Sequence, residues 1–162
     1  MKVWAGTEEC PFPDNLPQAR VVDQTCSLLY LPEPHDNDLP LVVFLHGLGD
    51  SAVSMSDSPA VVWLQEQMEE GTFPLSYVLI LEGKKGYWTD WLDGQVEHRY
   101  EQRVLDTVEN VLNEYSIDQS RMALVGISMG GFGALSIGLR NPEWFSAMIA
   151  LSPTDMDLAV QA

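Results

Sequence analysis

Basic residues are scarce in this sequence, which has 162 residues, 8 Lys and Arg residues, 24 Asp and Glu residues and a formal net charge of −16. A protein that binds nucleic acid needs Lys and Arg to displace counterions from phosphates, so the composition argues against a nucleic-acid partner. The same charge disfavours binding to anionic membrane surfaces. The acidic residues are spread along the chain rather than gathered in a tail, which is typical of a solvated surface.

The sequence also lacks the cysteines of a disulfide scaffold, because Cys10 and Cys26 are the only two and no metal-ligand spacing surrounds them. We therefore expect two unpaired thiols, and a single bridge between them stays open. The first residues have no uninterrupted apolar core of the kind found in signal peptides, and no stretch is long enough to span a membrane. These absences predict a soluble, cytoplasmic protein.

What is present is ample material for a folded core. Hydrophobic residues make up 46% of the chain, and it has 5 Trp, 5 Tyr and 5 Phe residues, which is too apolar for a disordered protein. The length favours one domain over residues 1–162. We expect an N-terminal β portion over about residues 1–40 and a core over about residues 41–152.

Apolar runs and helical patterns alternate along this core. Strands are expected at residues 41–45, 77–81, 121–126 and 146–153. Helices are expected at residues 59–71, 97–115 and 129–140. Between them we expect an aromatic loop at residues 82–94 and a turn at residues 116–120, and residues 21–32 are expected to form one or two strands. This alternation predicts an α/β fold, a three-layer α/β/α sandwich with a mostly parallel sheet.

The stretch from Gly126 to Gly130, GISMG, fits the pattern G-x-S-x-G between an expected strand and an expected helix. Such a turn is so tight that side chains two residues on either side of the serine would collide, and glycines at both places remove the collision. The hydroxyl of Ser128 then stands exposed at the carboxyl end of the sheet, with the N-terminus of the next helix pointing at it. The pattern predicts Ser128 as a catalytic nucleophile, with a glycine-rich packing turn as the alternative.

The segment His46-Gly47-Leu48-Gly49 follows the first core strand. A serine that attacks an acyl carbonyl needs two N–H donors aimed at the oxygen that becomes negative. We expect one from the backbone of Met129 and the other from this loop, where we choose Leu48, with Gly47 and Gly49 in support. A plain glycine turn is the alternative.

The three histidines offer no clear catalytic base. We expect His46, at the end of a buried strand, to be hydrogen-bonded support for its loop rather than the base. His35 and His98 lie in polar surroundings and are expected to face solvent.

Several stretches give the chain a resemblance to a known family: YLPEPHDNDLPLVVFLHGLGDS, GYWTDWLDG, RYEQRV and SRMALVGISMGGFGALSIGLRNPEWFSAMIALS. Together they resemble the putative-esterase family of α/β-hydrolases, which includes tributyrin-type esterases, S-formylglutathione hydrolases, feruloyl esterases and mycolyltransferases. The resemblance covers residues 30–152. The FLHGLGDS stretch is also similar to the acyl-protein thioesterase branch, but GISMGG and YWTDW favour the first family.

This resemblance implies an α/β-hydrolase fold and the hydrolysis of small-molecule carboxylic esters through an acyl-enzyme, without a metal or an organic cofactor. Ser128 would be the nucleophile, and the amides of Met129 and Leu48 would hold the oxyanion. Tyr87, Trp88 and Trp91 would line the mouth of the site and contact substrate. A packed aromatic loop is the alternative for these three side chains.

The chain departs from the family pattern after the nucleophile. In this fold an acid and then a histidine follow the serine, yet no histidine follows Ser128, and Asp155 and Asp157 come too early for the acid. The resemblance therefore implies that the C-terminal strands are missing. The last expected strand, at residues 147–151, would then be an uncovered apolar edge that invites self-association.

Three explanations for the missing base stay open. The chain can be an incomplete piece of a longer protein, which we favour, or a partner or swapped copy can supply the base. In the third, His46 or His98 takes its place. We expect a serine carboxylesterase. The alternatives are a thioesterase or acyltransferase of the same fold, and a catalytically silent binding or assembly module.

Overall fold

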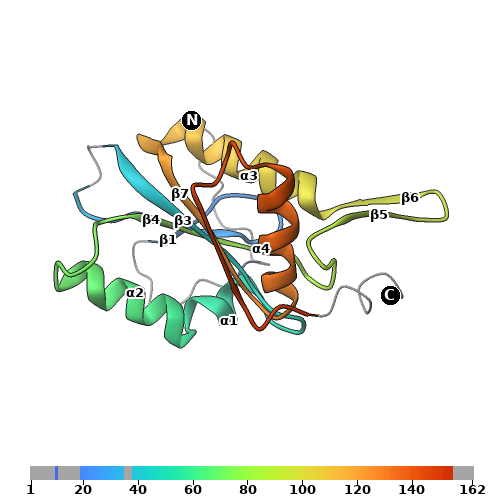
Figure 1. Cartoon of the computed structure of the whole chain (residues 1–162), viewed down its shortest axis with the longest axis horizontal. Helices are drawn as coiled ribbons and strands as arrows, with labels where there is room; N and C mark the ends of the chain where they lie inside the picture. The colour runs from blue at the N-terminus through green and yellow to red at the C-terminus, as the bar shows by residue number, and fades with distance from the viewer. Residues whose placement is uncertain (1–9, 11–18, 35–37, 155–162) are drawn as a thin grey trace.

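The computed structural model describes residues 10, 19–34 and 38–154. Its elements in chain order (Figure 1) are β1 (Ala19–Val21), β2 (Leu28–Tyr30), β3 (Leu39–Leu45), α1 (Ala52–Ser56), α2 (Pro59–Glu69), β4 (Tyr77–Leu81), β5 (Asp90–Asp93), β6 (Val96–Arg99), α3 (Tyr100–Glu114), β7 (Ile117–Ile127), α4 (Met129–Arg140) and β8 (Ala147–Leu151).

Six strands form one sheet in the order β1-β2-β4-β3-β7-β8. Strands β4, β3, β7 and β8 run parallel, whereas β2 pairs antiparallel with both β1 and β4. The mostly parallel sheet expected from the sequence is therefore confirmed, with the N-terminal β portion supplying β1 and β2. Because the carboxyl ends of parallel strands meet at one edge, the loops after β3, β4, β7 and β8 converge there.

Side chains of β3 alternate between two cores, as its period of two requires. Leu41, Val43 and Leu45 pack on the face covered by α3 and α4, whereas Val42 and Phe44 pack on the face covered by α1 and α2. All five side chains are buried, which is why the strand reads as a continuous apolar run. The helices lie on both faces of the sheet (Figure 1), so the three-layer α/β/α prediction is confirmed.

The prediction of a loop at residues 82–94 is wrong for the second half of that range. There β5 pairs antiparallel with β6 in a hairpin that projects from the body (Figure 1). Gly94 and Gln95 form the two-residue turn between the paired Asp93 and Val96, and Gly94 at the first turn position has φ of 61°, a conformation that glycine adopts readily. The hairpin takes the first residues of the helix expected at 97–115, and α3 therefore begins at Tyr100.

Two further elements differ from expectation at the ends of strands. Residues 117–120 of the turn expected at residues 116–120 are part of β7, in which Ile117 pairs with Leu39 ahead of a register shift. Helix α1 is an addition that no apolar periodicity indicates. Its start is fixed by a capping box in which Ser51 and Ser54 exchange hydrogen bonds between side chain and backbone.

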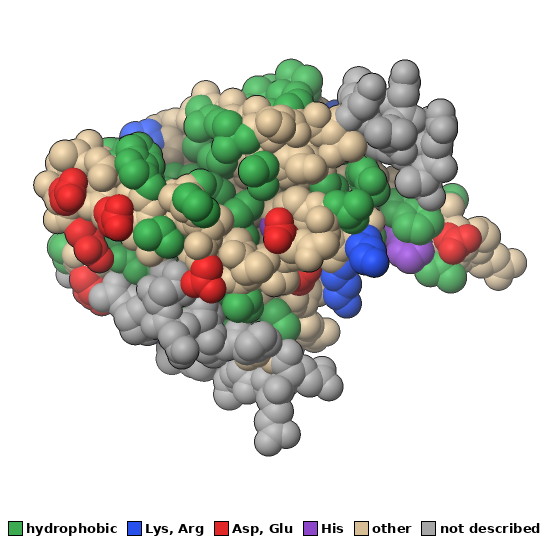
Figure 2. Space-filling model, turned by 90° about the horizontal axis from the view of Figure 1, so that it is seen from below, with side chains coloured by type: hydrophobic (Ala, Val, Ile, Leu, Met, Phe, Trp, Pro, Cys, Tyr) green, Lys and Arg blue, Asp and Glu red, His purple; other side chains and the backbone are tan. Residues whose placement is uncertain are grey.

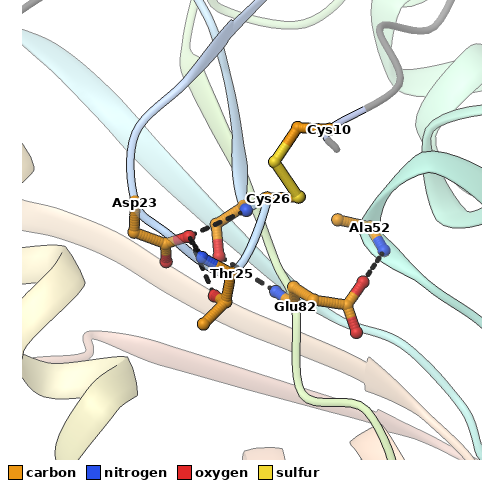
Figure 3. Close-up of a disulfide and its surroundings, with 7 residues drawn as sticks. Cys10, Asp23, Thr25, Cys26, Ala52 and Glu82 are labelled. Carbon is orange, nitrogen blue, oxygen red and sulfur yellow. Dashed lines mark hydrogen bonds between the residues drawn. A yellow bond between two sulfur atoms is a disulfide. The ribbon is translucent and has the colours of Figure 1, made fainter. Parts of the chain in front are cut away.

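Cys10 and Cys26 form a disulfide (Figure 3), so the expectation of two unpaired thiols is wrong. Cys26 lies in the turn between β1 and β2, which Asp23 organises by accepting hydrogen bonds from the amides of Thr25 and Ser27. The bridge joins residues 16 positions apart, and no local pattern reveals such a pairing. Disulfides persist mainly in oxidising compartments, which argues against the cytoplasmic location expected from the sequence.

The acidic surface is visible in the view from below (Figure 2), where Asp and Glu side chains gather toward the end of the molecule at which α2 ends. Glu66, Glu69 and Glu70 are exposed there. Their exposure fits the expected solvated face. Among the described residues, no helix combines the length and the apolar character needed to cross a membrane.

Replacing both Cys10 and Cys26 by serine should lower the free energy of unfolding by about 3 kcal/mol, the contribution expected when a bridge closes a loop of this size in the unfolded chain. Urea denaturation followed by circular dichroism measures the change. A reducing agent should shift the wild-type midpoint similarly and leave the double variant unchanged. Equal midpoints for the wild type and the double variant would contradict this account.

Candidate active site

Ser128 occupies the turn between β7 and α4, with φ of 54° and ψ of −117°. A positive φ is costly for a residue other than glycine, so neighbours must hold it. The Ser128 amide donates to the Leu151 carbonyl at 2.9 Å, and the Ser128 carbonyl accepts from the Thr154 amide at 3.1 Å. These contacts fix a strained backbone in which Ser128 is exposed at the carboxyl edge of the sheet.

The two flanking glycines are required by close approach. A Cβ on Gly126 would overlap the carbonyl of Gly130, and a Cβ on Gly130 would overlap the carbonyl of Leu45 at the end of β3. The collision expected from the sequence is thus present, but against backbone rather than between two side chains. Any larger residue at either position would push α4 away from the sheet.

The loop after β3 lies beside Ser128, because a Cβ on Gly47 would stand 3.6 Å from the Ser128 Cβ. The Asp50 amide donates to the Gly47 carbonyl at 3.2 Å, and Gly49 has φ of 88°, so the loop turns sharply around Leu48.

Neither predicted oxyanion amide has a protein acceptor in the described structure, but the two residues differ in exposure, because Leu48 is 52% exposed and Met129 is 0% exposed. Met129 is the first residue of α4, a position whose amide has no partner within the helix. In the part of the chain that the structure describes, the amides of Leu48 and Met129 make no hydrogen bond to a protein acceptor. Two unused N–H groups therefore belong to the two segments that border Ser128.

His46 is fully buried beneath this loop. Its Nδ1 donates to the Gly47 carbonyl at 2.8 Å, since a carbonyl can only accept. Its Nε2 lies 3.0 Å from the Gly83 amide, which donates to the neutral ring, and 3.3 Å from Glu82 Oε1, which would accept from the protonated ring. Either protonation state leaves His46 engaged with its own loop and with the loop after β4, which favours support over a role as the base.

Glu82 is a site residue that the sequence analysis missed. Its carboxylate accepts the amides of Ala52 at 2.9 Å and Lys84 at 2.8 Å and also contacts His46. Burial alone would raise the pKa of Glu82, but the hydrogen bonds from His46, Ala52 and Lys84 outweigh it and hold the pKa below its ordinary value. Glu82 is therefore an acceptor at neutral pH. No local motif surrounds it, so only its partners from distant segments reveal it.

The aromatic residues of the loop after β4 have different positions. Trp88 is 1% exposed, and its indole N–H donates to the His46 carbonyl at 3.2 Å, so the expectation that it contacts substrate is wrong. It packs against Gly83 and Gly133, where a Cβ would meet its ring. Tyr87 is half-buried and packs against the core on the face of the sheet covered by α3 and α4, to which Trp88 also belongs. Trp91, on the hairpin, is 42% exposed and alone among the three presents much surface.

The described residues bring no base to the Ser128 hydroxyl. Among them, no side chain forms a hydrogen bond with the Ser128 hydroxyl. His98 lies in β6 of the hairpin and is half-buried, not fully exposed as expected. Its ring stacks on Trp91 with ring centroids 3.9 Å apart. His35, Asp155 and Asp157 lie outside the described residues. Within those ranges, no cluster of three or more His, Cys, Asp or Glu side chains could hold a metal ion.

Comparison with curated proteins shows similarity to acylamino-acid-releasing enzymes. The chain is 31% identical over 124 residues to the acylamino-acid-releasing enzyme of Rattus norvegicus, a match that covers 74% of this chain and 16% of that enzyme. It is 28% identical over 170 residues to the enzyme of that name from Sus scrofa, covering 93% and 22% respectively. The chain therefore spans less than a quarter of the length of these relatives.

Solved structures share the fold at low sequence identity. The S-formylglutathione hydrolase of Staphylococcus aureus has a TM-score of 0.67 and 16% identity, with 86% of this chain and 57% of that chain covered. The ferulic acid esterase of Anaeromyces mucronatus, solved without substrate, has a TM-score of 0.63 and 20% identity, with 95% and 64% covered. In sequence, the model of the family described as "Putative esterase" matches residues 23–157. Since that match spans most of the chain, the protein belongs to the putative esterase family and has its α/β-hydrolase fold.

Proposed function

We propose that the chain bears the nucleophile and the oxyanion site of a serine carboxylesterase. The observation that carries the proposal is the exposed Ser128, held at φ of 54° and ψ of −117° between a strand and the N-terminus of α4. Such a strained turn is maintained where it presents a reactive group. The relatives named above are an S-formylglutathione hydrolase, a ferulic acid esterase and an acylamino-acid-releasing enzyme, and cleavage at an acyl carbonyl fits all three names.

In the proposed reaction, the Oγ of Ser128 forms a bond to the ester carbonyl carbon, and the carbonyl oxygen becomes negative. The amides of Leu48 and Met129 donate to that oxygen and stabilise it more than they stabilise the neutral carbonyl. The bond to the alcohol then breaks and leaves an acyl-serine. Water attacks the same carbon, releases the carboxylic acid and restores the hydroxyl.

The base that takes the Ser128 proton and returns it to the leaving alcohol is proposed to come from polypeptide outside these 162 residues. The structural relatives are longer, with only 57% and 64% of their chains covered. The 162 residues would then be the nucleophile-bearing part of a single domain. Without that polypeptide the site would bind an acyl group but turn it over slowly.

The uncovered edge of the sheet fits this proposal. Strand β8 is the last in the sheet order, and Met148, Ile149 and Leu151 are 36%, 48% and 44% exposed. An apolar edge of this kind pairs with further strands or with another copy. We propose that further polypeptide of the same domain covers it, and that the 162-residue chain alone self-associates through it.

In the longest polypeptide that the gene encodes, a fluorophosphonate probe should label Ser128. Ser128→Ala should abolish the labelling and lower kcat for p-nitrophenyl acetate by about a million-fold, as removal of a triad nucleophile does. The matched control is Ser152→Ala, because Ser152 is an exposed serine with positive φ at the end of the adjacent strand. Turnover that survives in Ser128→Ala would refute the nucleophile, and a wild type that neither reacts with the probe nor turns over ester would indicate a silent module.

Leu48→Pro removes the proposed oxyanion donor and should lower kcat by about 10²–10³-fold, the usual loss for one such donor. Leu48→Ala keeps the N–H and shortens a side chain that is already 52% exposed, so it should retain most of the wild-type rate. Steady-state kinetics on p-nitrophenyl acetate would compare the two. Similar losses in both variants would mean that the Leu48 side chain, rather than its amide, matters.

Light scattering after size-exclusion chromatography should find the 162-residue chain larger than a monomer. Ile149→Lys places a charge on the β8 edge and should return the chain to monomer, because burying an unpaired ammonium is costly. Leu92→Lys, at a side chain 71% exposed on the hairpin, is the control and should leave the association intact. Dissociation by Leu92→Lys instead would move the contact to the hairpin.

A further inference from the structure

The loop at residues 46–51, here named the oxyanion loop, is hydrogen-bonded at its start by the segment that follows β4. The Gly83 amide donates to the ring of His46, and the Trp88 indole donates to the His46 carbonyl. Both contacts act at the start of the oxyanion loop. The end of the loop, where α1 begins, has one contact from the same segment, the hydrogen bond from the Ala52 amide to Glu82 Oε2.

Glu82 is the one side chain of this segment that reaches both ends of the oxyanion loop. Its Oε1 lies 3.3 Å from His46 Nε2 and accepts a hydrogen bond from that atom when the ring is protonated, whereas the neutral ring accepts from the adjacent Gly83 amide. The Oε2 of Glu82 accepts the Ala52 amide at 2.9 Å. The Lys84 amide also donates to Oε1 at 2.8 Å and fixes the carboxylate plane. The carboxylate therefore contacts residues at both ends of the loop that contains Leu48.

The position of Glu82 is itself fixed from the N-terminal β portion. Its amide donates to Ser27 Oγ at 3.0 Å, and the Ser27 amide donates to Asp23 in the turn between β1 and β2. Cys26 in that turn is bridged to Cys10, and Figure 3 shows Glu82 between this turn and Ala52. The support for the oxyanion loop is thus continuous from the disulfide-linked turn to Ala52.

We propose that Glu82 is a positioning residue of the oxyanion site: its carboxylate holds the oxyanion loop by both ends and thereby directs the Leu48 amide toward the carbonyl that Ser128 attacks. The inference rests on the proposed function and adds a residue that does not touch substrate. Because an oxyanion donor matters most when the carbonyl oxygen is negative, loss of its alignment lowers kcat and leaves KM nearly unchanged.

Glu82→Ala in the full-length protein should lower kcat for p-nitrophenyl acetate by about 10–100-fold, less than loss of the donor itself, with KM within about twofold of the wild type. The double variant Glu82→Ala, Leu48→Pro should be no slower than Leu48→Pro, because both changes remove one interaction. Additive losses would overturn the proposal by showing that Glu82 acts elsewhere. The control Glu66→Ala removes an exposed carboxylate on α2 and should match the wild type.

Hydrogen exchange tests the same inference without turnover. In Glu82→Ala the Ala52 amide loses its acceptor, so it and the Asp50 amide, which donates to the Gly47 carbonyl, should exchange about tenfold faster or more, while α4 amides stay unchanged. Unchanged exchange in the oxyanion loop would overturn the inference. If the wild type has no Ser128-dependent turnover, the proposed function fails, and exchange still reports whether Glu82 holds the loop.

Should Glu82→Ala fail to fold, Glu82→Gln decides the matter, since it keeps the side-chain volume and one acceptor oxygen. Because the side-chain amide of Gln keeps only one acceptor oxygen, the backbone amide of either Ala52 or Lys84 should exchange faster in Glu82→Gln. The kcat should fall severalfold at constant KM. Wild-type exchange and kcat in Glu82→Gln would overturn the proposed role of the carboxylate. Thermal melting of each variant separates a local change from unfolding.

Discussion

Helix α4 approaches the end of β3 so closely that position 130 has no room for a Cβ beside the Leu45 carbonyl. Because of this contact the start of α4 lies against the carboxyl end of β3, so the direction of the chain must reverse directly after β7. The positive φ of Ser128 is the result, and so is the exposure of its side chain. The loop after β3 also lies close to the serine, since a Cβ placed on Gly47 would stand 3.6 Å from the Ser128 Cβ. The positions of the proposed nucleophile and of the proposed oxyanion donors thus share one geometric cause.

The parallel strands β3, β4 and β7 contribute in different ways to this edge. The loops after β3 and β7 carry the proposed oxyanion amides, whereas the loop after β4 contacts the residues that flank the loop after β3. Trp88 fills the space between that loop and α4, and Glu82 reaches from it to the start of α1. The antiparallel β1 and β2 lie farther away, but through Ser27 they fix the backbone of Glu82. The N-terminal portion is therefore a support for the site and not only a cover for the sheet.

The features that the sequence predicts are those that one local segment determines. Strand β3 is a buried run, α4 follows G-x-S-x-G, and the alternation of strands and helices requires parallel pairing. Other features depend on pairs of residues that are distant in the sequence. The disulfide joins residues 16 positions apart. The buried Trp88 donates to His46, 42 positions away, and Glu82 accepts from Ala52, 30 positions away. A single sequence has no signal for such pairings. The hairpin at β5 and β6 is different, because Gly94 at the first position of its two-residue turn is a local signal that the aromatic residues around it obscured.

The supports of the oxyanion loop also limit the direction from which a base can reach Ser128. Toward β3 and β4 the space beneath that loop is filled by His46, Glu82 and Trp88, whose polar atoms already have partners. On the other side lies the end of β8, since the Ser128 amide donates to Leu151. A strand added beyond β8 in parallel would end at the same edge, and the loop after it would arrive beside the hydroxyl. The apolar edge and the missing base of the proposed esterase thus have a common solution, because one added segment would cover the first and supply the second.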